Sequence, residues 1–300
     1  MPVSKIITIV KNNKLKLLAL VSVVIISQIF SSCMQFRTSN KKIYESFAAT
    51  KNKLKIDTFD TLGYNIRYSE VFNSQERPTV IFIHGAPGSM SDLMQFMKNE
   101  NLASKANLVS VDRPGYGYSN FGKQLTSIEK QAAILGFLIR KYQNKQKIIL
   151  VGHSYGGPIA ARLAAQYPNE IKGLVMAAPV LDPKNEKIFW FTHIAHWGGF
   201  RWMLPTSLCV ASFEKVNHAK ELELLMPYWE KITTPTTIIH GEQDGLAPFV
   251  NVAFCKKVVT NAPLETITKK DMGHLIPWKN PQLIYDAVYK YLGEKKEINN

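Results

Sequence analysis

The residues with the clearest chemical potential form a five-residue motif, Gly152-His153-Ser154-Tyr155-Gly156. The apolar run 148–151 precedes the motif and a helical pattern follows it, so Ser154 is expected at a tight turn between a buried strand and a helix. Such a turn strains the serine backbone and brings residues 152 and 156 together, where glycine has no Cβ atom to collide. A serine presented in this way can attack a carbonyl carbon once a base removes its proton.

The rest of the chain must supply the elements that hold this turn. Short apolar runs predict buried strands at 79–83, 108–111, 147–151, 174–177, 236–239 and 264–267, after an opening strand pair at 54–59 and 65–72. Helical patterns separate them at 92–103, 128–142, 155–167, 250–259 and 281–292. This alternation predicts an α/β fold, with a mostly parallel sheet flanked by helices.

One connection in this pattern is much longer than the others. More than 50 residues separate the strand at 174–177 from the strand at 236–239, whereas most connections are short. We therefore expect a helical cap at about residues 183–231, inserted before the strand at 236–239. The cap is rich in aromatic residues, which could roof an apolar acyl pocket, contact lipid or form the core of the cap itself.

The serine motif and four further segments together resemble the α/β-hydrolase fold superfamily. The four segments are His84-Gly85-Ala86-Pro87-Gly88, Asp112-Arg113-Pro114-Gly115-Tyr116-Gly117, Gly241-Glu242-Gln243-Asp244 and Gly273-His274. The resemblance covers most of residues 54–292, which we expect to form the hydrolase domain, with a short tail at 293–300. It implies that nucleophile, acid and histidine follow one another in this order along the chain.

This order assigns a catalytic triad. Ser154 is the expected nucleophile, His274 the base that takes its proton, and Asp244 the acid that fixes the imidazole tautomer and stabilises the imidazolium. The backbone N–H groups of Ala86 and Tyr155 are expected to bind the oxyanion that develops during attack. Because these donors are backbone groups, the two side chains are expected to matter only through their shape.

Other polar residues near these motifs have alternative roles. Asp182 follows the strand at 174–177 and is an alternative acid, because some members of the superfamily place theirs there. Asp112 is expected to hold its own glycine-rich turn. His84 and His153 are expected to hold loops rather than transfer protons.

The nucleophile narrows the choice of reaction. Dehalogenases and epoxide hydrolases of this fold use Asp at the elbow, so Ser154 favours hydrolysis of a carboxylic ester of a small or lipid-like molecule, without a cofactor. The segment 84–88 is also similar to the H-G-G-P-G motif of proline iminopeptidases, with Ala86 in place of glycine. An aminopeptidase-like, other amide, thioester or C–C bond hydrolase is therefore an alternative. A non-catalytic, membrane-tethered binding protein with this fold is another.

The first 32 residues have the pattern of a secretory signal peptide. Four lysines precede the apolar run Leu17–Phe30, and Ser31-Ser32-Cys33 follows it. At ~1.5 Å per residue the run is about 21 Å long, shorter than a ~30 Å hydrocarbon core, which disfavours a permanent transmembrane helix. Cys33 resembles the lipidated cysteine of bacterial lipoproteins. We expect an exported lipoprotein, anchored to a membrane and facing the periplasm or cell exterior; an uncleaved anchor or an ordinary signal peptide are the alternatives.

The net charge of +14 is unevenly distributed along the chain. Residues 33–53 form an expected basic tether in which Glu45 is the only acidic residue. The tether could be attracted to anionic lipid head groups or act as a solvated linker. Elsewhere the basic residues occur in scattered pairs, without an arginine-rich or aromatic-interleaved stripe, so nucleic acid is not an expected partner.

Cysteine and histidine usage does not favour a metal site. The chain has three cysteines and no C-x-x-C pair, and His193 and His196 have no evident third ligand, so no bound metal is expected. Cys209 and Cys255 could form a disulfide in an oxidising compartment or remain two buried thiols.

Overall fold

The structure is a computed structural model that describes residues 16–18, 21–22, 35–143, 146–197 and 201–294. Most of the expected signal peptide, Cys33 and the tail beyond residue 294 lie outside the described residues. Within the described part of the chain, no helix combines the length and apolar character needed to cross a bilayer.

Eight strands form one sheet in the order β1-β2-β4-β3-β5-β6-β7-β8. They are β1 (Leu54–Thr61), β2 (Tyr64–Val71), β3 (Thr79–Ile83), β4 (Asn107–Val111), β5 (Ile148–His153), β6 (Ile171–Ala177), β7 (Thr236–Gly241) and β8 (Leu264–Lys269). β2 is antiparallel to both of its neighbours, whereas the pairs from β4 to β8 are parallel. The mostly parallel sheet predicted from the sequence is confirmed.

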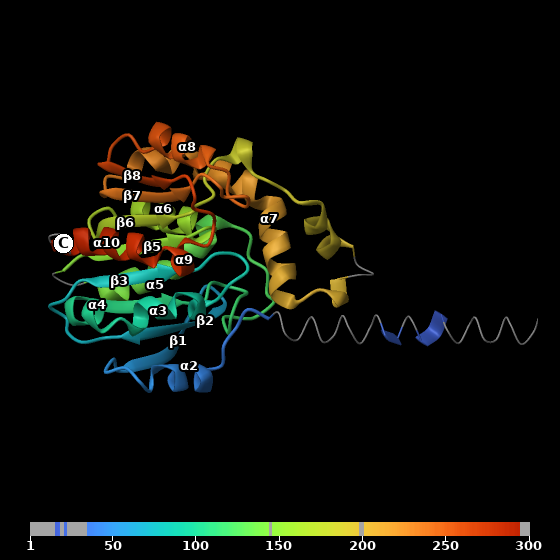
Figure 1. The fold of residues 1–300 in the computed structure, drawn as a ribbon, viewed down its shortest axis with the longest axis horizontal. Helices are drawn as coiled ribbons and strands as arrows, with labels where there is room; N and C mark the ends of the chain where they lie inside the picture. Colours follow the sequence, from blue (N-terminus) through green and yellow to red (C-terminus); the bar gives the residue numbers. More distant parts are fainter. Residues whose placement is uncertain (1–15, 19–20, 23–34, 144–145, 198–200, 295–300) are drawn as a thin grey trace, which may run out of the picture.

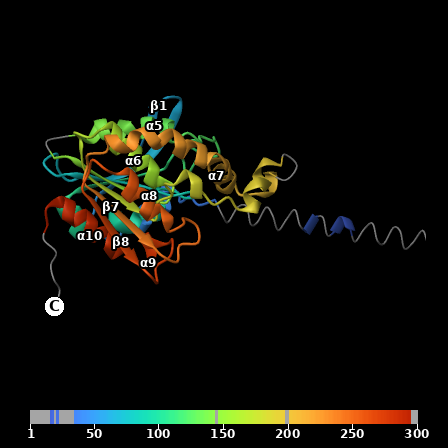
Figure 2. The same cartoon turned by 90° about the horizontal axis from the view of Figure 1, so that it is seen from above.

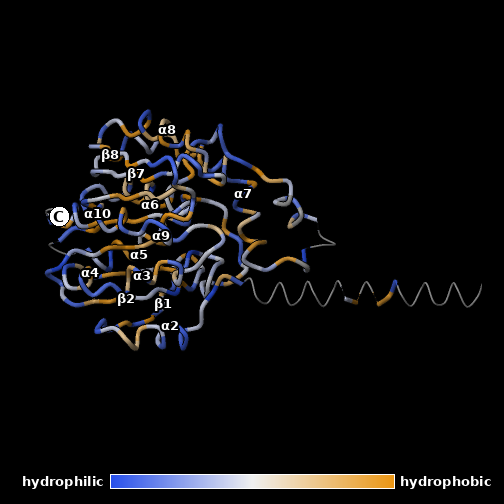
Figure 3. The backbone as a smooth tube through the Cα atoms, in the orientation of Figure 1, coloured by the Kyte–Doolittle hydropathy of each residue, from blue (hydrophilic) through white to orange (hydrophobic). Residues whose placement is uncertain are grey.

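Helices cover both faces of the sheet (Figures 1 and 2). On one face lie α5 (Ile128–Tyr142), α6 (Gly156–Gln166) and α8 (Val250–Val258); on the other lie α2 (Asn40–Phe47), α3 (Met94–Lys98), α4 (Glu100–Lys105) and α10 (Pro281–Leu292). Successive residues of a strand point to opposite faces. Ile148 and Leu150 of β5 therefore pack in the first layer, and Ile149 and Val151 in the second. The central strands are accordingly apolar along their length (Figure 3).

The single helix predicted at 92–103 is wrong. The structure has a 3-10 helix η1 (Met90–Leu93) followed by the two short helices α3 and α4. Asn99 separates them with extended backbone angles, φ −69° and ψ 107°, and its side chain accepts a hydrogen bond from Leu102 N. Asparagine favours such a cap over a helix interior because its amide competes for backbone hydrogen bonds.

Part of the expected basic tether is folded against the domain. Ser39 caps the start of α2 through a hydrogen bond from Lys42 N. Ile43 and Phe47 of this helix are buried in the core layer that contains α3 and α4. These residues therefore pack as part of the domain, which a solvated linker would not do.

The connection between β6 and β7 is built from helical elements. They are η2 (Pro183–Asn185), η3 (Trp190–His196), η4 (Arg201–Met203), α7 (Thr206–Leu225) and η5 (Met226–Lys231). Together with α7, η3 and η4 project from one end of the sheet (Figure 1). Trp229 is buried, whereas Trp190, Trp197 and Trp202 are 80%, 60% and 50% exposed. The cap tryptophans therefore divide into one core residue and three largely on the surface.

Candidate active site

The turn after β5 has the strained geometry expected of a nucleophile elbow. Ser154 has a φ of +53° although it is not glycine. A Cβ atom on Gly152 would lie 2.4 Å from the carbonyl oxygen of Gly156, and one on Gly156 would lie 2.4 Å from that of Ile83. Both approaches are too close for any side chain. The predicted contact between residues 152 and 156 is confirmed as the reason for Gly152, whereas Gly156 is required by its contact with β3.

Two loops bring a histidine and a carboxylate to this serine. His274, after β8, places Nε2 3.0 Å from Ser154 Oγ, and its Nδ1 lies 2.8 Å from Oδ2 of Asp244, after β7. The carboxylate accepts, so Nδ1 carries the proton. Nε2 is then free of a proton and can accept one from the serine hydroxyl. In this geometry His274 is oriented to act as a base for Ser154.

Asp244 is held ionised by its surroundings. Its second oxygen, Oδ1, accepts hydrogen bonds from Leu246 N at 2.9 Å and Ala247 N at 2.8 Å. Burial alone would raise the pKa of this carboxyl, but the hydrogen bonds from His274 and from the two backbone amides lower it below the usual value. The carboxylate can therefore compensate a positive charge on the imidazole.

Asp182, the alternative acid, is used elsewhere. Its Oδ1 accepts from Lys184 N at 2.9 Å and its Oδ2 from Asn185 Nδ2 at 2.7 Å, so it caps η2. The structure thus brings Asp244, and not Asp182, to His274.

The two residues expected to bind the oxyanion lie beside the nucleophile. Tyr155 follows Ser154 directly and precedes α6. Gly85, the neighbour of Ala86, packs so tightly on the elbow that a Cβ atom there would lie 3.0 Å from Ser154 Cβ. The N–H groups of Ala86 and Tyr155 therefore belong to two segments that meet at Ser154.

A buried histidine holds the loop that carries Ala86. His84 Nε2 accepts from Arg113 N at 3.0 Å, which leaves Nδ1 to donate to Gly85 O at 2.7 Å. Burial, and then the nearby Arg113 guanidinium, hold the pKa of His84 well below its ordinary value, so the ring is neutral. The predicted loop-holding role of His84 is confirmed.

His153 and Asp112 also act on loops. His153 Nε2 donates to His274 O at 3.2 Å, and burial lowers the His153 pKa to about 3. Asp112 accepts from Met90 N at 2.8 Å and Tyr118 N at 2.9 Å, and so ties its own turn to η1. Both roles agree with the sequence prediction.

An ion pair between the core and the cap was not anticipated. The Arg113 guanidinium contacts Glu214 of α7 with Nη1–Oε1 at 2.7 Å and Nη2–Oε2 at 3.1 Å, and both side chains are almost fully buried. Arg113 stands in a recognisable motif, but nothing in the sequence pairs it with a residue about 100 positions away. Sequence reasoning also did not identify Trp278 as a neighbour of the site. Its ring stands edge-on to the ring of His153, with centroids 5.3 Å apart.

Within the described residues, Cys209 and Cys255 do not form a disulfide and no metal site is present. Cys209 and Cys255 are buried, free thiols. His193 and His196 lie in η3, and the described residues contain no cluster of three or more potential metal ligands. Cys33 lies outside the described residues.

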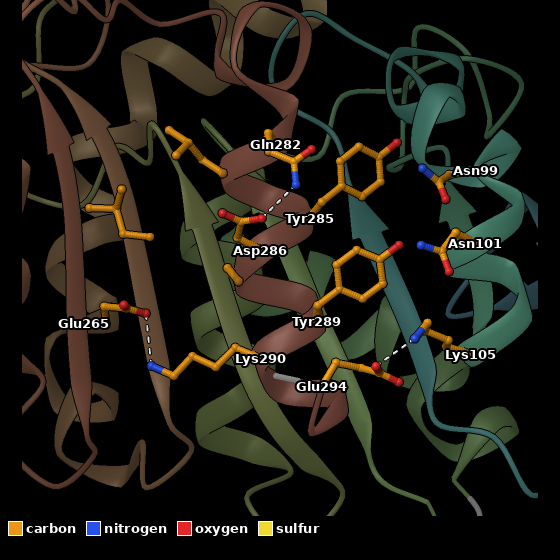
Figure 4. Close-up of a pocket in the computed structure, with 13 residues that line it drawn as sticks. Asn99, Asn101, Lys105, Glu265, Gln282, Tyr285, Asp286, Tyr289, Lys290 and Glu294 are labelled. Atoms are coloured by element: carbon orange, nitrogen blue, oxygen red, sulfur yellow. Dashed lines mark hydrogen bonds and ion pairs between the residues drawn. The ribbon is translucent and has the colours of Figure 1, made fainter. Parts of the chain in front are cut away.

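A groove of about 720 Å³ lies over α10, remote from these loops (Figure 4). Its lining is largely polar, and Lys105–Glu294 and Lys290–Glu265 ion pairs, at 2.7 and 3.1 Å, cross it. None of its lining residues belongs to the Ser154–His274–Asp244 group. We therefore do not place the reaction there.

Known proteins are similar to this chain in sequence and fold. Residues 78–197 match the family model described as the alpha/beta hydrolase fold. A poly(3-hydroxyalkanoate) depolymerase of Ectopseudomonas oleovorans is 24% identical over 73% of this chain and 86% of its own length. A Haemophilus influenzae protein, provisionally named an esterase/lipase, is 22% identical over 82% of this chain and 93% of its own length. A solved bacterial membrane phospholipase A has a TM-score of 0.63, at 18% identity over 95% of this chain and 98% of that one.

The sheet order, the strained turn at Ser154 and the likeness to solved structures together define the fold. The chain has the α/β-hydrolase fold.

Proposed function

We propose that the protein is a serine hydrolase that forms an acyl-enzyme at Ser154. The observation that carries this proposal is the continuous hydrogen-bond chain from Ser154 Oγ through His274 to Asp244, at 3.0 and 2.8 Å. A free serine hydroxyl is a weak nucleophile, and an adjacent base oriented by a carboxylate is the arrangement that activates it.

The reaction follows from the protonation states. Ser154 Oγ attacks the carbonyl carbon while its proton passes to His274 Nε2, and the resulting imidazolium is stabilised by Asp244. The tetrahedral oxyanion is bound by the N–H groups of Ala86 and Tyr155, each worth on the order of 3 kcal/mol. His274 then returns the proton to the leaving oxygen, and water repeats the sequence to release the acid.

Carboxylic esters are the substrate class that we propose. The depolymerase relative is named for a polymer whose units are joined by esters, and the Haemophilus influenzae relative for esterase or lipase activity. An ester needs no amine leaving group to be recognised, so the triad and the oxyanion hole suffice for its hydrolysis. Amide hydrolysis is the alternative that the assay must separate.

The test combines a covalent probe with a substrate panel. A fluorophosphonate should label the full-length protein but not Ser154→Ala, and p-nitrophenyl acetate to hexanoate should be hydrolysed faster than the matched p-nitroanilides. Ser110→Ala, which removes a buried hydroxyl of β4 that is bonded to Met90 O, is the matched control and should keep both activities. Labelling or turnover that survives in purified Ser154→Ala contradicts the proposal.

We also propose that the chain is exported and anchored by a lipid on Cys33. The signal-peptide pattern and the cysteine that follows it support this proposal. The Arg67 side chain donates to Thr38 O at 3.1 Å and to Asn40 Oδ1 at 2.9 Å, so the chain is held on the domain from residue 38. Only residues 34–37 would then separate the lipid from this contact, which would keep the catalytic domain close to the bilayer.

A further inference from the structure

The Arg113 guanidinium contacts both segments that carry the assigned oxyanion donors. Its Nη2 donates to Gly85 O at 2.9 Å, and its Cζ lies 4.7 Å from the centre of the Tyr155 ring. The Gly85–Ala86 peptide is trans and planar, so a fixed Gly85 carbonyl also fixes the direction of the Ala86 N–H. Arg113 therefore contacts both of the segments that carry these N–H donors.

The cap supplies the charge that keeps this guanidinium in place. Burial alone would lower the pKa of Arg113, but the Glu214 carboxylate of α7 raises it above the ordinary value. Tyr116 donates a further hydrogen bond to Glu214 at 2.5 Å, and Gln131 bonds to both partners at 2.8 Å. A buried guanidinium without its carboxylate would be driven to find other partners, and its bonds to the Gly85 loop would shift.

A second residue of α7 reaches Tyr155 directly. His218 lies one helical turn after Glu214, on the same face of the helix. Its ring stacks on Tyr155 with centroids 4.4 Å apart and an angle of 25° between the planes. Tyr155 OH donates to Thr126 O at 3.0 Å. Arg113, His218 and this hydrogen bond thus restrain the ring of the residue whose N–H faces the oxyanion.

The imidazole of His218 is itself anchored within the cap. Its Nδ1 lies 3.1 Å from Glu186 Oε1, an atom that Lys215 also contacts at 2.5 Å. His218 and Glu186 are both buried, so the stacking surface offered to Tyr155 has a defined orientation. The Tyr155 side chain therefore has defined contacts with both the core and the cap.

We propose that Glu214 and His218 are positioning residues through which the cap holds the oxyanion hole. Glu214 acts through Arg113 on the Ala86 peptide, and His218 acts through the Tyr155 ring on the elbow. The inference rests on the proposed acyl-enzyme function. It makes stabilisation of the transition state dependent on a docked cap, beyond any contact that the cap makes with substrate.

The first test is Glu214→Gln, which keeps the shape and removes the charge. Loss of one oxyanion donor costs about 10²–10³ in kcat, so misplacement should lower kcat by about 10- to 100-fold and change KM by less than about threefold. The inhibition constant of a trifluoromethyl ketone, whose adduct with serine places an oxyanion in the hole, should rise by the same factor as kcat/KM falls.

Glu221→Gln on the same helix is the matched control. Glu221 also accepts a hydrogen bond from the core, from Ile128 N at 3.0 Å, but that residue begins α5 and not the oxyanion loop. We expect its kcat and its ketone inhibition to stay within about twofold of wild type. Melting temperatures of both variants separate lost stability from lost positioning.

The second test uses His218 and applies even if Glu214→Gln does not fold. His218→Phe retains an aromatic face for Tyr155 and should keep most of the wild-type kcat. His218→Ala removes the stack and should lower kcat by about tenfold or more at similar KM, with the matching rise in the ketone constant. Wild-type kcat and ketone affinity in a folded Glu214→Gln, or in His218→Ala, overturn the inference.

The ketone also separates this inference from the proposed function. An adduct in the wild type without ester turnover would refute the ester substrate class. The effect of the Glu214 and His218 variants on ketone inhibition could still be measured in that case. No adduct in the wild type would refute both, because the hole would then bind no oxyanion. An adduct that is insensitive to both α7 residues would refute the positioning role alone.

Discussion

Replacing Asp244 by asparagine should disable the site while leaving its architecture intact. Oδ1 of Asp244 accepts from the backbone N–H groups of Leu246 and Ala247. In the variant, the amide oxygen must occupy this position, because an NH₂ group there would face two donors. The NH₂ group then faces His274 Nδ1, which has to accept rather than donate.

The forced tautomer has a direct catalytic consequence. With Nδ1 accepting, the imidazole proton moves to Nε2, 3.0 Å from Ser154 Oγ. A protonated Nε2 cannot take the serine proton, and the carboxylate that would stabilise the imidazolium is also gone. The expected loss in kcat/KM is about 10⁴-fold, or about 5 kcal/mol in the activation free energy.

The assay is hydrolysis of p-nitrophenyl acetate at neutral pH by the full-length protein. Asp182→Asn is the matched control. Asp182 follows β6 as Asp244 follows β7, but its carboxylate accepts hydrogen bonds from Lys184 and Asn185 of η2. We expect near wild-type activity in the control and a melting temperature within a few degrees of wild type in Asp244→Asn. If Asp244→Asn keeps more than about a tenth of the activity, or Asp182→Asn is the damaging change, the tautomer argument is refuted.

Two further predictions concern stability and anchoring. Burial raises the pKa of Asp92, in η1, to about 7. Between about pH 4 and pH 7 the folded state therefore binds a proton that the unfolded state has released. The free energy of unfolding should accordingly fall by up to about 4 kcal/mol as the pH rises from about 4 to 7. Asp92→Asn should flatten this part of a urea-unfolding pH profile, and an unchanged slope would show that Asp92 does not cause it. Cys33→Ser should abolish labelling by radioactive palmitate, and it should either block cleavage of the signal peptide or release soluble protein. Labelling that persists would refute lipid attachment at Cys33.

The sequence alone determines the sheet and the elbow, because both depend on local patterns. Apolar runs such as 148–151 are buried on both faces wherever they are placed in a parallel sheet. Gly152 is required by its contact with Gly156 inside the same five-residue motif, whereas Gly156 is required by its contact with Ile83 of β3. His274 and the two candidate acids, Asp244 and Asp182, were predictable for a related reason, since each follows a strand and the carboxyl ends of parallel strands meet at one edge.

Patterns misled where two local preferences competed. The apolar spacing of 92–103 suits one helix, but Asn99 prefers a cap, and the structure breaks the helix there. Likewise, the basic composition of 33–53 concealed the apolar face formed by Ile43 and Phe47, which is buried against the core.

Only the tertiary structure could choose between Asp244 and Asp182, and only it could pair the cap with the catalytic loops. Both carboxylates follow strands, and the 2.8 Å contact with His274 depends on how two loops pack. Arg113 and Glu214 are about 100 residues apart, and neither carries a local signal for the other. Charge pairing in a protein interior is decided by which side chains are desolvated together, and that property exists only once the cap has folded onto the sheet.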